Sequence, residues 1–192
     1  FGCCELCFTS YRIPEAHTIQ QIIEETRGGL PFVFRAPSRL SEEHADNSDL
    51  ARRFAAALWP LKEAGQLAGV VAQFPPEFEF FRENFERLCL LRDSLEGILL
   101  IAEFGCPDWL TPRAARHLAK ANIALACVDG GTSLKEKTFF CATAGLAYVR
   151  FQGRNNSRWV KGDGSAQYNY LYSRAELASV IPEIRRLEQE CE

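Results

Sequence analysis

The feature that most constrains the fold of this chain is the alternation of short apolar runs with amphipathic segments. Continuous apolar runs of five to eight residues are typical of buried parallel strands, and helices usually connect such strands. The sequence therefore predicts an α/β fold, a parallel sheet covered by helices. The six predicted strands are Cys3–Phe8, Phe32–Ala36, Gly69–Phe74, Gly97–Phe104, Ile123–Asp129 and Leu146–Gln152.

The segments between these runs carry helix signals. Apolar residues recur at helical spacing from Ile19 to Ile23 and stop at Gly28. Thr111 precedes a proline and is expected to cap a helix, and Ser173 begins a Ser-x-x-Glu capping box. Residues 130–144 lack helical periodicity, which predicts a long loop.

Composition narrows the class of protein. A chain of 192 residues with 47% hydrophobic residues fits one globular domain, and the absence of methionine together with a start at Phe1 suggests a fragment. The net charge of −3 argues against a protein coated in basic charge for nucleic acid. We expect no membrane span. Eight dispersed cysteines favour a reducing compartment, so a cytoplasmic location is expected.

The segment CELC, which contains Cys4 and Cys7, is interpreted as part of a strand. Residues three apart on a strand point to opposite faces, so these two thiols are not expected to share a metal ion or a disulfide. Glu5 lies between them, on the face of Cys3 and Cys7. A carboxylate in a buried strand is costly unless it is paired or functional.

Polar side chains follow the apolar runs at the ends of five predicted strands. The carboxyl ends of parallel strands are where α/β folds collect their ligand-binding groups. The pattern therefore predicts a site at that edge of the sheet. Its members are Arg35, Gln73, Glu103, Asp129, Arg150 and Gln152.

Five motifs resemble those of a known family. CELCFTSYRIP resembles the family's VEINSTFYRIP, and QFPPEF at 73–78 resembles QFPPSF. IAEFGCPDW at 101–109 is similar to VEFRHPSW. RFQGRNNSRW at 150–159 resembles RFHGRN followed by a tryptophan, and YNYLYS at 168–173 resembles YDYLYS. The chain thus resembles the YecE-like proteins (domain of unknown function 72), which are TIM barrels.

The resemblance implies a (β/α)8 TIM-barrel fold that is partial in this chain. The family barrel has one strand before CELC and another after the last helix, and the 192 residues contain neither. The six predicted strands would correspond to the second to seventh of the barrel. We therefore expect residues 1–192 to be a single YecE-like domain that lacks the first and last strands.

The resemblance also implies a set of site residues at the barrel mouth. Those that match the family's motifs are Glu5, Tyr11, Gln73, Glu103, Asp129, Arg150, Gly153, Arg154, Asn155, Tyr168, Tyr170 and Tyr172. Other family positions are changed: Cys7 replaces Asn, Gly105 and Cys106 replace Arg and His, Gln152 replaces His, and Asn169 replaces Asp. The two histidines were candidates for proton transfer or metal ligation, so their replacement argues against a shared catalytic activity.

One hypothesis for the site is an enzyme, a metal-dependent phosphoester hydrolase or a sugar isomerase-like enzyme. Glu5, Glu103 and Asp129 would converge to hold Mg²⁺ or Mn²⁺, or to act as general acid and base. The alternative is a closed ionic network in which Glu5 and Glu103 pair with Arg35 and Arg150.

A second hypothesis is a module that binds a phosphate-bearing small molecule or nucleic acid without catalysis. Arg150, Arg154, Arg158 and Lys161 lie within twelve residues, with Trp159 among them. Arginines suit phosphate, and an aromatic ring offers a stacking face for a base. The predicted ligand-binding residues are Tyr11, Arg35, Gln73, Arg150, Gln152, Gly153, Arg154, Asn155, Trp159, Tyr168 and Tyr170.

Overall fold

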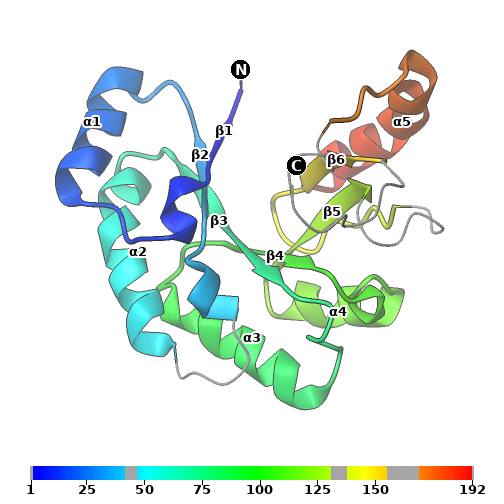
Figure 1. Cartoon of the computed structure of the whole chain (residues 1–192), viewed down its shortest axis with the longest axis horizontal. Helices are drawn as coiled ribbons and strands as arrows, with labels where there is room; N and C mark the ends of the chain where they lie inside the picture. The colour runs from blue at the N-terminus through cyan, green and yellow to red at the C-terminus, as the bar shows by residue number, and fades with distance from the viewer. Residues whose placement is uncertain (1, 42–46, 131–137, 155–168, 192) are drawn as a thin grey trace. The chain divides into compact units, whose positions relative to one another are not determined.

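A computed structural model describes residues 2–41, 47–130, 138–154 and 169–191 of the chain (Figure 1). The chain divides into two compact units, Phe1–Cys106 and Pro107–Glu192. Both units combine parallel strands with helices, which confirms the predicted α/β class.

The first unit is a parallel sheet in which each strand pairs with the next one along the chain. Its strands are β1 (Cys4–Leu6), β2 (Phe32–Arg35), β3 (Leu67–Phe74) and β4 (Leu100–Phe104). Its helices are α1 (Ala16–Thr26), α2 (Ser48–Glu63) and α3 (Arg82–Ser94), with short 3-10 turns η1 (Phe8–Ser10) and η2 (Ser38–Ser41). In Figure 1 the three helices lie in chain order along the strands of this unit.

Burial explains why these strands form a sheet. Phe34, Val70 and Leu100 are fully buried on one face, and Val71 and Ile101 are fully buried on the other. Helix α2 adds Phe54 and other fully buried residues to the core. Burying apolar surface stabilises such a sheet by roughly 25 cal/mol per Å². The near-continuous apolar composition of β3 and β4 is therefore what a sheet buried on both faces requires.

The second unit contains β5 (Ala124–Gly130) and β6 (Tyr148–Gly153), which are parallel neighbours. Its helices are α4 (Pro112–Lys120) and α5 (Arg174–Cys191), and a 3-10 turn η3 covers Pro107–Trp109. Both predicted caps are confirmed. Thr111 accepts a hydrogen bond from the Ala114 amide at 3.2 Å. Ser173 and Glu176 exchange backbone-to-side-chain bonds of 2.8 and 3.2 Å.

All six predicted runs contain a strand, but several bounds were wrong. The first strand is shorter than predicted because Cys7 adopts a helical backbone conformation and leads into η1. The fourth begins at Leu100 rather than Gly97, whose φ of +80° belongs to a turn. The sixth is shifted to Tyr148–Gly153. The described part of the predicted long loop, residues 138–144, contains no helix or strand.

All eight cysteines are free thiols. Cys4 lies in β1, but the strand interpretation of CELC was wrong for Cys7, which is exposed, precedes η1 and donates its thiol to Glu5 Oε1 at 3.2 Å. Among the helices that the structure describes, none is both long and apolar enough to cross a membrane.

Candidate functional site

Four of the five predicted site residues of the first unit lie on one face of its sheet, and Tyr11 lies outside the strands. The register pairs Glu5 with Val33, Arg35 with Val71, and Gln73 with Glu103. Paired residues share a face, and so do residues two apart along a strand. We call this set, with one residue from each of β1 to β4, the polar face: Glu5, Arg35, Gln73 and Glu103.

Two short-range contacts join the members of the polar face in pairs. The Arg35 Nη2 atom donates to Glu5 Oε1 at 3.3 Å. The Gln73 amide donates to Glu103 Oε1 at 2.6 Å, which fixes the orientation of a carboxylate that is only 8% exposed. The Glu5–Arg35 pair is half of the closed ionic network that the sequence suggested as an alternative.

Arg35 has a donor that remains unsatisfied. Its Nε atom is buried and has no hydrogen-bond partner among the described residues. A buried donor without an acceptor costs about 1–3 kcal/mol, so each such atom needs an explanation. The backbone of Arg35 is firmly placed, because its carbonyl accepts a 2.5 Å hydrogen bond from the buried Thr9 hydroxyl.

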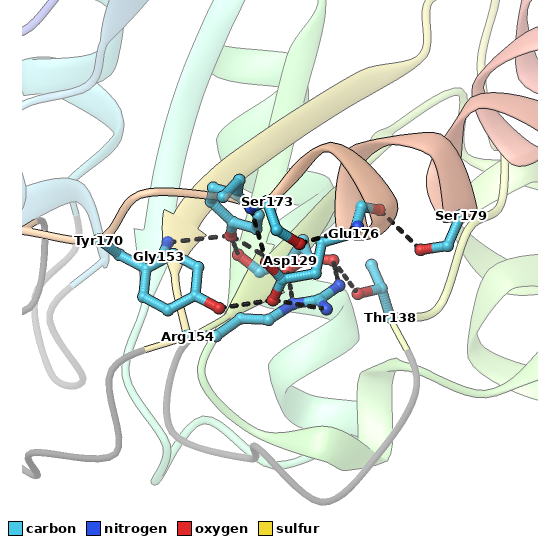
Figure 2. Close-up of polar contacts among 9 residues, drawn as sticks. Asp129, Thr138, Gly153, Arg154, Tyr170, Ser173, Glu176 and Ser179 are labelled. Atoms are coloured by element: carbon cyan, nitrogen blue, oxygen red, sulfur yellow. Dashed lines mark hydrogen bonds and ion pairs between the residues drawn. The ribbon is translucent and has the colours of Figure 1, made fainter.

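Asp129 of β5 is the centre of a different arrangement in the second unit (Figure 2). Its carboxylate is 1% exposed and is held by the guanidinium of Arg154, with Nε–Oδ1 at 2.8 Å and Nη2–Oδ2 at 2.6 Å. The Tyr172 hydroxyl lies 3.1 Å from Oδ1, and the Thr138 hydroxyl donates to Oδ2 at 3.2 Å. This is a bidentate, charge-assisted pair, the strongest geometry available to an arginine.

Glu176 of α5 closes the outer side of the same arrangement. Its Oε1 atom accepts from the Tyr170 hydroxyl at 2.5 Å and from Arg154 Nη1 at 3.4 Å. Its Oε2 atom accepts from the Ser173 amide as part of the capping box. Figure 2 shows Tyr170 and Glu176 beside Arg154. We call the whole set the Asp129 cluster: Asp129, Thr138, Arg154, Tyr170, Tyr172 and Glu176.

These contacts fix the charge of the cluster. The hydrogen bond from Arg154 lowers the pKa of Asp129, although burial acts in the opposite direction. Hydrogen bonds from Tyr170 and then from the Ser173 amide lower the pKa of Glu176 to about 2. The hydrogen bond with Asp129 raises the pKa of Arg154. Both carboxylates therefore stay ionised at neutral pH, far from the pKa near 7 that suits general acid–base catalysis.

Two glycines let the strand ends approach closely beside this cluster. Gly130 and Gly153 have φ values of +94° and +89°, in the region that favours glycine. A Cβ atom on Gly130 would collide with the Gly153 carbonyl oxygen. The Gly153 amide donates to the Tyr172 hydroxyl at 3.0 Å. The Gly153 backbone thus joins β6 to the Asp129 cluster, and its predicted ligand-binding role stays a prediction.

Arg150 does not lie on the face of Asp129. Asp129 is the register partner of Phe151, and the neighbouring Arg150 points to the opposite face of β6, together with Gln152. Arg150 instead donates to the Tyr148 hydroxyl at 3.3 Å. Asp129 and Arg150 thus lie near the carboxyl ends of neighbouring strands, but on opposite faces, and their common site stays a prediction.

The remaining predicted residues divide into described and undescribed ones. Tyr11 follows η1 and its side chain is 91% exposed. Asn155, Trp159 and Tyr168 lie outside the described residues. Sequence reasoning missed Thr9, although it lies within the CELCFTSYRIP motif, and Thr138, which belongs to none of the five motifs. It recognised Glu176 only as part of a helix cap, and the cap is the signal that could have drawn attention to it.

The described residues do not assemble a metal centre. Within the described ranges, no group of three or more histidine, cysteine, aspartate or glutamate side chains could hold a metal ion. Of the three predicted ligands, Glu5 and Glu103 come from strands β1 and β4, with two strands between them. Asp129 belongs to the second unit and is saturated by Arg154. The metal site at these carboxylates stays a prediction without support from the geometry.

Comparison with known proteins places the chain among relatives of undetermined activity. A family model described as "Protein of unknown function DUF72" matches residues 1–192. The UPF0759 protein YunF of Bacillus subtilis (strain 168) is 26% identical over 209 residues, covering all of this chain and 74% of that protein.

Solved structures of similar proteins share the fold. The crystal structure of a DUF72 family protein from Thermotoga maritima (TM1631) matches with a TM-score of 0.85 and 30% identity, over 100% of this chain and 75% of that one. A DUF72 family protein from Enterococcus faecalis (EF0366) matches with a TM-score of 0.86 and 21% identity, over 100% and 75%.

Proposed function

We propose that this chain, which belongs to the DUF72 family of proteins of unknown function, binds a phosphate ester on the polar face of its first unit. The observation that carries the proposal is the buried Nε atom of Arg35, which has no acceptor among the described residues. An oxyanion is the acceptor that an arginine edge takes most readily. The Arg35 side chain is 24% exposed, but its Nε atom is buried, so a phosphate oxygen would reach Nε only by displacing a group that covers it.

A phosphate would use the same edge of the guanidinium that Arg154 uses for Asp129. In Arg154 the Nε and Nη2 atoms hold one carboxylate between them. In Arg35 the corresponding Nη2 atom makes only a 3.3 Å contact with Glu5. A phosphate oxygen on Nε would satisfy the buried donor, and a second oxygen would compete with Glu5 for Nη2.

The carboxylates of the polar face indicate what else the ligand carries. Glu5 and Glu103 are hydrogen-bond acceptors, and a carboxylate disfavours a second anion nearby. Carboxylate oxygens accept hydrogen bonds from hydroxyl groups of a ligand. The ligand class that fits is therefore a phosphate ester of a hydroxyl-bearing molecule, such as a sugar phosphate, with its phosphate at Arg35.

Hydrolysis of the bound ester is a second candidate function, favoured by the environment of Glu103. This carboxylate is 8% exposed and is oriented by Gln73 at 2.6 Å, as a general base must be held. Glu103 would take a proton from water as the water oxygen attacks phosphorus, and the ester oxygen would leave with a proton from solvent. The Mg²⁺ or Mn²⁺ ion that the sequence predicts would belong to this candidate function. The proton transfer from water to Glu103 requires only the Glu103 carboxylate.

Nucleic acid is disfavoured as the ligand. The chain has a net charge of −3, whereas a polyanion requires a broad basic surface. Arg154, which the sequence offered as a phosphate ligand, is already shared by Asp129 and Glu176. A phosphate could bind Arg154 only by displacing one of these two carboxylates.

The fold of the whole protein is part of this proposal. Within each unit the strands are parallel, and each pairs with the next one along the chain. This is the strand order of a (β/α)8 barrel. We propose that residues 1–192 are one domain that supplies the second to seventh strands of such a barrel. The similar proteins are longer than this chain, which covers 74–75% of them. Eight free thiols support the proposal of a cytoplasmic location.

Calorimetric titration with ribose 5-phosphate tests the binding function. Arg35→Gln removes the donor edge and should weaken binding at least 10-fold, since a charge-assisted hydrogen bond contributes about 1.5–3 kcal/mol. Arg53→Gln is the matched control, because Arg53 is an exposed arginine on α2, away from the polar face. Equal affinities for the wild type and Arg35→Gln would refute the proposal. Release of inorganic phosphate that is lost in Glu103→Gln would support the hydrolase version.

A further inference from the structure

We infer that the ligand is a mononucleotide, whose base stacks on Tyr11 while its phosphate binds Arg35. This inference rests on the proposed phosphate site and narrows the class of ligand. Tyr11 is the most exposed aromatic residue among those that the structure describes, at 91%. Aromatic rings usually bury most of their surface, so a ring this exposed next to a predicted site is available to stack on a ligand.

The backbone of Tyr11 is fixed beside the backbone of Arg35. Thr9, two residues earlier, donates a 2.5 Å hydrogen bond to the Arg35 carbonyl. Ser38, three residues after Arg35, donates to the Ser10 carbonyl at 3.4 Å. The Tyr11 amide itself bonds to the Phe8 carbonyl, which completes η1. Consecutive Cα atoms are 3.8 Å apart, so Tyr11 lies within about 8 Å of the residue that bonds to Arg35.

This arrangement fixes the backbone that carries an exposed ring close to the backbone that carries Arg35. The anchor residue Thr9 is fully buried, so the turn that holds Tyr11 is part of the core. Fixing the backbone in advance lowers the entropy cost of binding. A planar base on the ring and a phosphate on Arg35 are the two ends of a nucleotide. The ribose lies between the base and the phosphate, and the carboxylates of the polar face can accept hydrogen bonds from its hydroxyl groups.

The charge of the molecule favours a single nucleotide over a polymer. Only Arg35 among the four residues of the polar face carries a positive charge, and two of the others are carboxylates. One arginine suffices for one phosphate. A strand of nucleic acid needs a groove with positive charge along its length, which the polar face does not supply.

Paired titrations with AMP and ribose 5-phosphate test the inference, because the two ligands share the phosphate and ribose and differ in the base. Stacking on one aromatic ring should make AMP bind about 10-fold more tightly. Tyr11→Ala should remove this preference and leave the affinity for ribose 5-phosphate unchanged. Tyr11→Phe keeps the ring and should retain the preference. Phe81→Ala is the control for loss of an exposed aromatic residue, since Phe81 is 56% exposed and precedes α3.

The outcomes separate this inference from the proposed function. If both ligands bind equally and both need Arg35, the phosphate site stands and the mononucleotide is wrong. If AMP binding is insensitive to Arg35→Gln, the proposed phosphate site fails and the inference fails with it. Binding of a single-stranded oligonucleotide that is tighter than binding of AMP and falls steeply with salt would also overturn the mononucleotide class. Loss of the AMP preference in Tyr11→Ala alone supports the inference.

Discussion

Arg35 is the last residue of β2, and Arg154 directly follows β6. Each arginine contacts a carboxylate, but their hydrogen bonding differs. Arg154 makes two short bonds to Asp129, at 2.8 and 2.6 Å, and a third contact with Glu176. In the part of the chain that the structure describes, the Arg35 guanidinium contacts Glu5 at 3.3 Å and its buried Nε donor has no acceptor. The Asp129 cluster is thus closed by its own residues, whereas the polar face retains bonding capacity.

This difference separates a structural role from a binding role. A bidentate pair around a carboxylate that is 1% exposed holds β5, the residue after β6 and the start of α5 together. A ligand would have to break those bonds to use Arg154. Arg35 Nε has no acceptor among the described residues, so an oxyanion at Nε would break no existing hydrogen bond of that atom. The polar face is therefore the better candidate for function.

The largest expected effect comes from disrupting the approach of β5 and β6 beside the Asp129 cluster. Gly130→Ala places a Cβ atom against the Gly153 carbonyl oxygen at a φ of +94°. We expect a loss of about 3 kcal/mol or more, from backbone strain and the collision together. Gly28→Ala is the control, since Gly28 has a φ of +74° with no atom within 4 Å of its added Cβ. Urea unfolding would measure both, and equal losses would show that the close approach is unimportant.

The next effect compares the two arginines directly. Arg154→Met leaves Asp129 buried and unpaired, which should cost about 2–4 kcal/mol after allowance for the 33% exposure of Arg154. Arg35→Met removes a weak pair and an unsatisfied donor, so its cost should stay below about 1 kcal/mol. The free energies of unfolding of the two variants at pH 7 check this. Similar losses in both would contradict the distinction between a closed and an open arrangement.

A smaller effect should appear as the pH falls. The pKa values of Asp129 and Glu176 are lowered in the folded protein, so their contribution to stability is present above their usual values of 3.8 and 4.5. This contribution is lost as the pH falls through the pKa values of the folded protein, and the pKa of Glu176 in the folded protein is about 2. Arg154 is the largest cause of the lowered pKa of Asp129, so the stability difference between the wild type and Arg154→Met should shrink as the pH falls below 3.8. A difference that stays constant over this range would count against the ionised cluster.

Sequence reasoning identified the elements because their signals are local. Apolar runs placed all six strands, and Thr111 and Ser173 cap the helices that they were expected to cap. The first strand was too long in the prediction because the turn at Cys7 depends on its packing with η1. Family motifs supplied Tyr11 and Arg154 but gave no indication of how their environments differ.

The hydrogen-bond partners of each site residue could not be predicted, because they are distant in the sequence. Arg35 meets Glu5 across 30 residues, and Arg154 meets Asp129 across 25. Which arginine is saturated depends on side-chain geometry that a strand-end pattern does not encode. Likewise, Asp129 and Arg150 both end apolar runs, and only the register of β5 with β6 shows that they point to opposite faces.

Nuclear magnetic resonance of the arginine Nε–H groups tests the central distinction most directly. Ribose 5-phosphate would be added to the ¹⁵N-labelled protein, with the Arg35 and Arg154 signals assigned from the Arg35→Lys and Arg154→Lys variants. We predict that the Arg35 Nε–H signal moves downfield as it gains an acceptor and that the Arg154 signal stays in place. Movement of the Arg154 signal with a stationary Arg35 signal would contradict the account.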